Sequence, residues 1–175
     1  MNTAPKYSPL QMFIHWLSAI LVILVITLPL MKGVLADSFG GMGNLFMIHK
    51  SLGVLIFFIT ICRIVVIIRQ GVPEVLAKHQ KLQRILSKAV QGMIYLLLLV
   101  LPLSGYLMSS RTISFFGLFT INGLNLPASL QSFLHSVHIF SAYLIIALIL
   151  LHILAALYHH YWCKDNVLRS MLPIK

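Results

Sequence analysis

Eight histidines are the residues of this sequence best suited to chemistry. Four of them, His15, His49, His138 and His152, fall within or at the edges of long apolar runs. An ionisable side chain at membrane depth is costly, so the default inference is a function that involves a partner. For one isolated histidine, a neutral ring hydrogen-bonded to a neighbouring helix explains the position equally well. The spacing of the four histidines has to decide.

His138 and His152 lie fourteen residues apart in the same apolar run. In an α-helix this spacing gives roughly 21 Å of rise and a rotation about 40° short of four full turns. Both side chains therefore face the same way, one near each membrane surface. A metal ion or water site needs ligands that lie close together, whereas two planar cofactors stacked across a membrane suit this separation. Two haems fit it, and they would be non-covalent because the sequence has no C-x-x-C-H motif.

Each haem iron then needs a second axial ligand at the same depth from another helix. His15 begins the first run and His152 lies toward the same end of the last run, so they pair at an inner haem, with a mismatch of several ångströms that helix tilt can absorb. His49 begins the second run as His138 begins the last, and these two match at an outer haem. Histidine on both faces leaves iron no open position, which favours one-electron transfer over O₂ activation.

Three other residues are weaker candidates for the cofactor sites. Arg63 lies fourteen residues after His49 and shares its helix face at the inner level, so it either pairs with a haem propionate or snorkels to the membrane surface. Lys50 is a similar candidate at the outer haem. His159, two turns after His152, either hydrogen-bonds a quinone carbonyl or belongs to an ordinary interfacial belt. No residue is assigned to catalysis.

The elements that would position these residues are four membrane-spanning helices. The chain has 175 residues, of which 59% are hydrophobic and 9% charged, so its main solvent is lipid. Four runs approach the twenty residues that a bilayer core of about 30 Å requires, at about residues 10–31, 47–68, 89–110 and 134–161. We expect an all-α, integral membrane four-helix bundle that forms one di-haem domain over residues 1–175. The third span has no histidine and is expected only to pack.

Basic residues predict the orientation of the bundle. They gather in the link after the second span and in the two chain ends, where they include Lys6, Lys78, Lys81, Arg84, Lys164, Arg169 and Lys175. The positive-inside rule therefore places both termini in the cytoplasm. Links 33–46 and 111–133 then face outward, and the apolar stretch 115–126 is expected on the membrane surface. This scatter explains the net charge of +10 without nucleic acid, which would need a clustered basic face.

The motifs around the histidines resemble those of the bacterial cytochromes b561, small di-haem membrane cytochromes. They are YSPLQMFIHW at 7–16, MIHKSLG at 47–53, IYLLLLVLPLSGYLM at 94–108 and LHILAALYHHYWCKDN at 151–166. The resemblance covers nearly the whole chain and implies the same histidine pairing, two haems b and a bacterial inner-membrane location. It further implies electron exchange with ubiquinone on the inner side and, for the superoxide oxidase type, oxidation of periplasmic superoxide.

The leading hypothesis is therefore a superoxide:ubiquinone oxidoreductase with membrane lipid, ubiquinone and superoxide as partners. The outward cations Lys32, Lys50 and Arg111 would concentrate a small anion near the outer haem. One alternative is the cytochrome b subunit of a larger dehydrogenase or hydrogenase. Another is a transporter whose histidines relay protons or bind a metal, although such sites usually lie near the midplane on broken helices. Cys62 and Cys163 form no metal or redox spacing and are expected to be inert.

Overall fold

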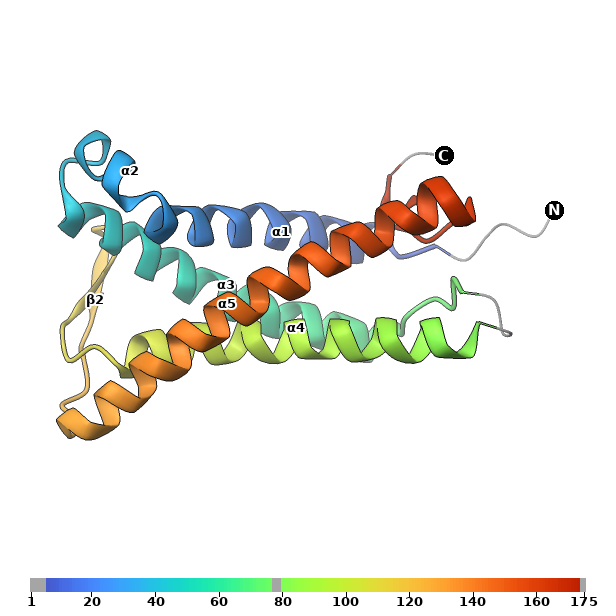
Figure 1. The fold of residues 1–175 in the computed structure, drawn as a ribbon. Coiled ribbons are helices and arrows are strands. Elements are labelled where there is room, and N and C mark those ends of the chain that lie inside the picture. The colour runs from blue at the N-terminus through green and yellow to red at the C-terminus, as the bar shows by residue number, and fades with distance from the viewer. Residues whose placement is uncertain (1–5, 77–79, 174–175) are drawn as a thin grey trace.

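The computed structural model describes residues 6–76 and 80–173, in which four long helices dominate (Figure 1). These helices are α1 (Pro9–Leu30), α3 (Met42–Gln70), α4 (Lys81–Leu107) and α5 (Ala128–Tyr158). The shorter elements are helix α2 (Lys32–Ser38), strands β1 (Ile113–Phe115) and β2 (Phe119–Ile121), a π-helical turn (His159–Cys163) and a 3₁₀ turn (Arg169–Met171). Two of the basic residues that predict the orientation, Lys78 and Lys175, lie outside the described residues.

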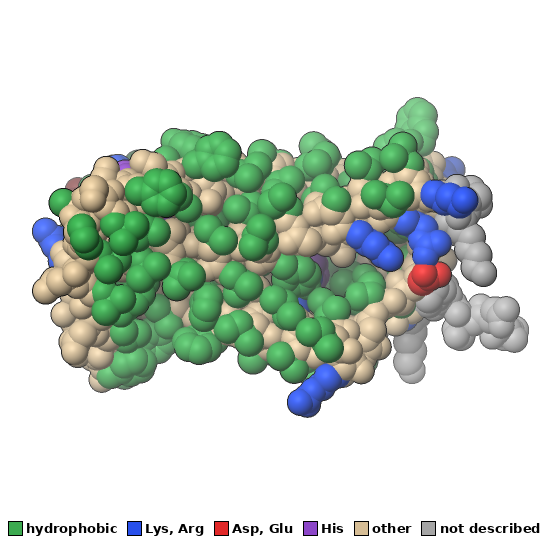
Figure 2. All heavy atoms as spheres, turned by 90° about the horizontal axis from the view of Figure 1, so that it is seen from below, with side chains coloured by type: hydrophobic (Ala, Val, Ile, Leu, Met, Phe, Trp, Pro, Cys, Tyr) green, Lys and Arg blue, Asp and Glu red, His purple; other side chains and the backbone are tan. Residues whose placement is uncertain are grey.

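The long helices are strongly apolar, and few of their side chains are buried inside the protein. Their most apolar 18-residue windows have mean hydropathies of 1.8 to 2.7, and at most 17% of each window is buried inside the protein. Such a surface requires lipid as its solvent. In lipid the backbone N–H and C=O groups must be paired within the helix, which these helices achieve. Figure 2 shows apolar side chains along the length of the visible face. The predicted all-α membrane four-helix bundle is confirmed.

The helices extend beyond the apolar runs that predicted the spans. α4 begins at Lys81 and α5 at Ala128, whereas the runs begin near residues 89 and 134. Hydropathy marks only the part of a helix that lies in lipid, while lysine, arginine and glutamine are good helix formers that continue it into the interface. α1 begins sharply because Ser8 and Gln11 form a capping box ahead of it, with Pro9 as the first helical residue.

The four helices meet in one central core. α1 packs on α3, α3 on α4, and α4 on α5. The core joins side chains of all four helices, namely Val22, Ile56, Leu97, Leu98 and Ile145. Figure 1 shows α5 running obliquely across the other helices, so that its two ends lie over different neighbours. This obliquity decides which helix each histidine of α5 can reach.

A small hairpin covers one end of the bundle. Strands β1 and β2 pair antiparallel, and β1 packs on α3. The fully buried Ser51 hydroxyl lies 2.9 Å from the Phe116 amide and 3.1 Å from the Ser114 carbonyl oxygen, which ties the hairpin to α3. The apolar stretch expected on the membrane surface is therefore divided, since Leu118 and Phe119 in the turn and β2 are exposed while β1 lies against the protein.

The described chain ends lie together at the opposite end of the bundle. The Tyr7 amide donates to the Ser170 carbonyl at 3.3 Å, and the Trp16 indole donates to the Met171 carbonyl at 2.9 Å. In Figure 2 several Lys and Arg side chains gather at this end of the visible face. We call it the inner end and the hairpin end the outer end.

Candidate functional site

His15 of α1 and His152 of α5 lie together toward the inner end. Their ring centres are 6.3 Å apart, with 65° between the ring planes. A ligating imidazole nitrogen lies about 2 Å from its metal ion, so two rings on opposite sides of one ion have centres roughly 6 Å apart. Edge-to-face ring pairs also occur at this separation. The geometry therefore permits a shared iron between the two rings.

His49 of α3 and His138 of α5 form a second pair toward the outer end. Their ring centres are 6.4 Å apart, with 80° between the planes. The two pairs thus have nearly equal separations. The mismatch expected for the inner pair from counting residues along straight helices is absent, because α5 runs obliquely across the bundle (Figure 1).

Backbone carbonyls orient both rings of the outer pair. The Nδ1 atom of His49 lies 2.9 Å from the Val25 oxygen, and that of His138 lies 3.0 Å from the Leu101 oxygen. A carbonyl oxygen only accepts, so Nδ1 carries the proton in both rings and Nε2 is left with a free lone pair. Histidines that ligate a metal characteristically donate their other nitrogen in this way.

The Val25 carbonyl is available to His49 because of a proline. In a regular helix this carbonyl would accept from the amide four residues later, which here belongs to Pro29 and carries no hydrogen. The His49 ring supplies the missing donor. Pro29 thus connects the sequence of α1 to the orientation of a ring on α3.

The prediction that the third span only packs is wrong, because α4 contributes several contacts to the outer histidine pair. At the outer pair, its Leu101 carbonyl and Ser104 hydroxyl lie 3.0 and 3.3 Å from His138 Nδ1. A Cβ atom on Gly105 would lie only 3.0 Å from the His138 ring, so glycine permits this approach. A search for histidines in the sequence misses such contacts, since backbone oxygens and a glycine carry no distinctive residue type.

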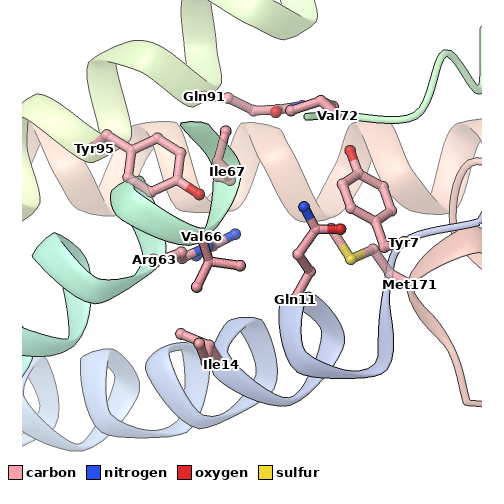
Figure 3. A pocket seen from close by; sticks show the side chains of 10 residues that line it. All are labelled: Tyr7, Gln11, Ile14, Arg63, Val66, Ile67, Val72, Gln91, Tyr95 and Met171. Atoms are coloured by element: carbon pink, nitrogen blue, oxygen red, sulfur yellow. The ribbon is translucent and has the colours of Figure 1, made fainter. Parts of the chain in front are cut away.

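Arg63 of α3 lies beside the inner pair, at the level that its spacing predicted. Its guanidinium donates to His15 Nδ1 at 2.6 Å and lies 4.9 Å above the centre of the Tyr95 ring of α4. In Figure 3 Arg63 lies between Tyr95 and Gln11, beside a cavity of about 30 Å³, which is large enough for a water molecule. Among the described residues Arg63 forms no salt bridge.

The contact between Arg63 and His15 bears on whether a haem fits. A His15 ring that ligates through Nε2 keeps its proton on Nδ1, so Arg63 cannot donate to that nitrogen at the same time. A guanidinium displaced from Nδ1 needs an anionic partner nearby, and a haem propionate is such a partner. The residues at the inner end therefore fit the group if Arg63 turns from His15 to a propionate.

Lys50 lies at the outer end beside His49. Its ammonium group donates at 3.1 Å to the hydroxyl of Ser109, which lies just beyond α4. Lys50 and Arg111 are close enough for their charges to interact. The structure thus brings two of the three predicted outward cations together near the outer pair.

His159 lies just beyond α5, in the π-helical turn at the inner end. Its Nδ1 forms an ion-pair contact of 2.5 Å with an Asp165 oxygen, whose other oxygen accepts from the Val167 amide at 3.0 Å. Asp165 was not singled out from the sequence. The available signal was its rarity, because the whole chain contains only three acidic residues.

Comparisons with known proteins decide the family. A sequence model of the family described as prokaryotic cytochrome b561 matches residues 6–173. The chain belongs to this family. It is 31% identical over 175 residues to "Cytochrome b561 homolog 2" of Escherichia coli strain K12, which covers 98% of this chain and 93% of that protein. It is 34% identical over 174 residues to "Probable superoxide oxidase CybB" of Yersinia pestis, which covers 97% of both chains. "Cytochrome b561 homolog 1" of E. coli is 26% identical over 174 residues.

Membership fixes the coarse function of this cytochrome b561. It is a membrane electron-transfer protein of a family that binds b-type haem. The four spans and the prokaryotic family make it a multi-pass protein of the bacterial inner membrane. The predictions of a haem-binding family and of electron transport are confirmed.

Proposed function

We propose that His15 and His152 hold one b-type haem and that His49 and His138 hold a second. The observation that carries this proposal is the presence of two histidine pairs at opposite levels of α5, with ring centres 6.3 and 6.4 Å apart. The free Nε2 atoms of the outer pair support it further. A haem held by two histidines would supply one-electron transfer rather than O₂ activation.

The basic side chains beside each pair would hold the propionates. Arg63 suits this role at the inner haem because it is half-buried and contacts a ring nitrogen and an aromatic face rather than an acid. Lys50 is the corresponding candidate at the outer haem, where its ammonium group donates to a hydroxyl group.

As the substrates we propose periplasmic superoxide and ubiquinone, with the inner end in the cytoplasm. Two superoxide anions are oxidised to two O₂ molecules, and their two electrons with two protons reduce one ubiquinone to ubiquinol. The name of the Yersinia relative supports the superoxide half. Lys50 and Arg111 support it physically, since positive charge at the outer end attracts a small anion.

His159 would bind the quinone. Asp165 holds its Nδ1, so Nε2 is available to hydrogen-bond a quinone carbonyl near the membrane surface. The position two turns beyond His152 places this contact on the inner side of the proposed haem.

The haem assignment is tested by the absorption spectrum and haem content of the purified, dithionite-reduced protein. We expect b-type bands and a pyridine haemochrome content of two haems per chain. One haem per chain would contradict one of the two pairs. A protein without b-type bands would contradict both pairs and would instead support a histidine-based transporter.

The substrate assignment is tested by rapid mixing of the oxidised protein with superoxide. We expect the haem bands to be reduced, and ubiquinol to form when a soluble ubiquinone analogue is added. Haems that superoxide leaves oxidised, but that a dehydrogenase or hydrogenase partner reduces, would instead support the cytochrome subunit of a larger complex. Dithionite reduction of the same sample provides the control for functional haem.

A further inference from the structure

The turn that follows α5 gathers three metal-ligating side chains outside the histidine pairs. His159, Cys163 and Asp165 each offer one ligand atom, and all three atoms lie within 4.8 Å of one another. They come from the π-helical turn and the two residues after it. The π-helical turn and the left-handed backbone of Lys164, with φ of 52°, direct these three side chains to one side. Cys163 was expected to be inert because its spacing matches no cysteine motif, but its metal-ligating neighbours are a histidine and an aspartate.

The donor set suits one class of ion. Imidazole nitrogen, thiolate sulfur and carboxylate oxygen are the three protein ligands of zinc. A soft thiolate beside an imidazole disfavours Mg²⁺ and Ca²⁺, which prefer oxygen alone. With three protein ligands, the fourth position of a tetrahedral ion is left for water.

The side chains are held near one another before any ion arrives. The His159 ring and the Asp165 carboxylate are already in contact at 2.5 Å, and the second carboxylate oxygen is anchored by the Val167 amide. The His159 carbonyl accepts from the Asp165 amide at 3.2 Å, which closes the turn. Cys163 is half-buried at the end of the π-helical turn. Little ordering is therefore needed on binding.

The residues around the three side chains leave a path for a metal ion, but they also include two positive charges. Asp165 also lines a hollow of about 290 Å³ together with His160, Lys164 and Arg169. An ion and its water can enter through such a hollow. Lys164 and Arg169 repel a cation, but the Asp165 carboxylate and a deprotonated thiol together contribute two negative charges directly at the ion. Because the thiol must lose its proton, binding releases protons and strengthens as the pH rises.

We propose that His159, Cys163 and Asp165 form a zinc-binding site at the inner end of the protein. A zinc ion there would occupy the ring that the proposed function assigns to the quinone carbonyl. This consequence rests on the proposed function, whereas the zinc site itself does not.

The test is equilibrium dialysis of the tag-free, haem-loaded protein against Zn²⁺, with metal measured by atomic emission. We expect one tight zinc ion per chain, and we expect Cys163→Ser or Asp165→Asn to weaken its binding by about tenfold or more. Cys62→Ser is the matched control, because Cys62 is the other free cysteine and lies within α3 rather than in the turn after α5. Zinc should also slow alkylation of Cys163 by iodoacetamide.

Two outcomes would overturn the site: zinc affinity unchanged in Cys163→Ser, or an equal loss in Cys62→Ser. The haem spectrum of each variant confirms that the bundle is intact, since these positions lie beyond the proposed ligands. Ubiquinol formation provides a separate measurement. If zinc binds but quinone reduction is unaffected, the quinone role of His159 is contradicted and the zinc site stands.

Discussion

At the scale of single residues, chemistry in this protein depends on which ring nitrogen each histidine has free. His49 and His138 donate Nδ1 to helix carbonyls at 2.9 and 3.0 Å, so Nε2 can act as a ligand. His15 instead accepts from Arg63, an arrangement that a bound haem would have to change. The same residue type therefore has different hydrogen-bonding roles at the two ends.

The proposed outer ligand is tested by His138→Ala. We expect loss of the outer haem and a haem content that falls from two per chain to one, because no second ring then faces His49. The pyridine haemochrome assay measures this change. His135→Ala is the matched control, since this exposed histidine lies one turn earlier on α5 and should leave both haems in place. Loss of both haems in His138→Ala would contradict two independent sites.

The close approach of α4 to His138 is tested by Gly105→Ala. The added Cβ would lie 3.0 Å from the His138 ring, which forces the ring to shift away from its carbonyl partner. We expect weaker outer haem retention by about tenfold, measured by haem transfer to an acceptor protein. Gly92→Ala on the same helix meets nothing within 4 Å and should retain haem normally. Equal behaviour of the two variants would show that the glycine at 105 is not needed.

At the scale of elements, the ends of the helices and a proline in α1 position the rings. Pro29 removes an amide that would have bonded the Val25 carbonyl, and that carbonyl then orients His49 on α3. At the same end of the bundle, Ser51 connects α3 to the hairpin. In both cases a backbone group that lacks a backbone partner is hydrogen-bonded by a side chain from another element.

The role of the proline is tested by Pro29→Ala. The new amide would compete with the His49 ring for the Val25 carbonyl, so the ring would be held less firmly. We expect a shifted spectrum and a lower retention of the outer haem, by about tenfold, while the inner haem is unchanged and serves as an internal control. Low-temperature absorption spectra separate the two haems. An unchanged outer band would mean that the Val25 carbonyl accepts both donors without effect.

The attachment of the hairpin is tested by Ser51→Ala. This variant leaves the Phe116 amide without its partner, which should lower the free energy of unfolding by about 1–3 kcal/mol. Hydrogen exchange of residues 113–121 should increase, and thermal unfolding should report the stability loss. Ser136→Ala is the control, because this exposed serine bonds only its own helix at Ser132. Slow exchange retained in Ser51→Ala would assign the attachment to β1 packing alone.

At the scale of the whole molecule, the two ends differ in charge and in chemistry. The outer end carries Lys50 and Arg111 near one histidine pair. The inner end carries the chain ends, Arg63 and the His159–Asp165 pair. Electrons that enter at one end and leave at the other would cross the central apolar core, with α5 contributing a histidine to each level.

The outer charges are tested through the rate at which superoxide reduces the oxidised haems. Lys50→Gln combined with Arg111→Gln should lower this rate by about two- to tenfold at low ionic strength, because the anion is no longer attracted. The difference should shrink as salt screens the charges. Lys88→Gln, an exposed cation toward the inner end of α4, should leave the rate unchanged. A rate insensitive to both salt and the outer variants would contradict electrostatic attraction of superoxide.

The sequence by itself determined the four spans, the helical class and the histidines that face the bundle. It could do so because lipid burial requires long apolar runs and because a fixed helical rise sets the depth of every residue. The spacing of His138 and His152 therefore predicted two levels, and the spacing of Arg63 predicted its place at the inner one.

Only the tertiary structure decided the contacts that depend on how one helix lies against another. The oblique path of α5 equalised the two ring separations, and α4 brought Leu101 and Gly105 against His138. The pairing of His49 with the Val25 carbonyl and the meeting of Cys163 with Asp165 follow from backbone geometry. Backbone atoms are the same in every residue, so no residue type in the sequence marks where they will be needed.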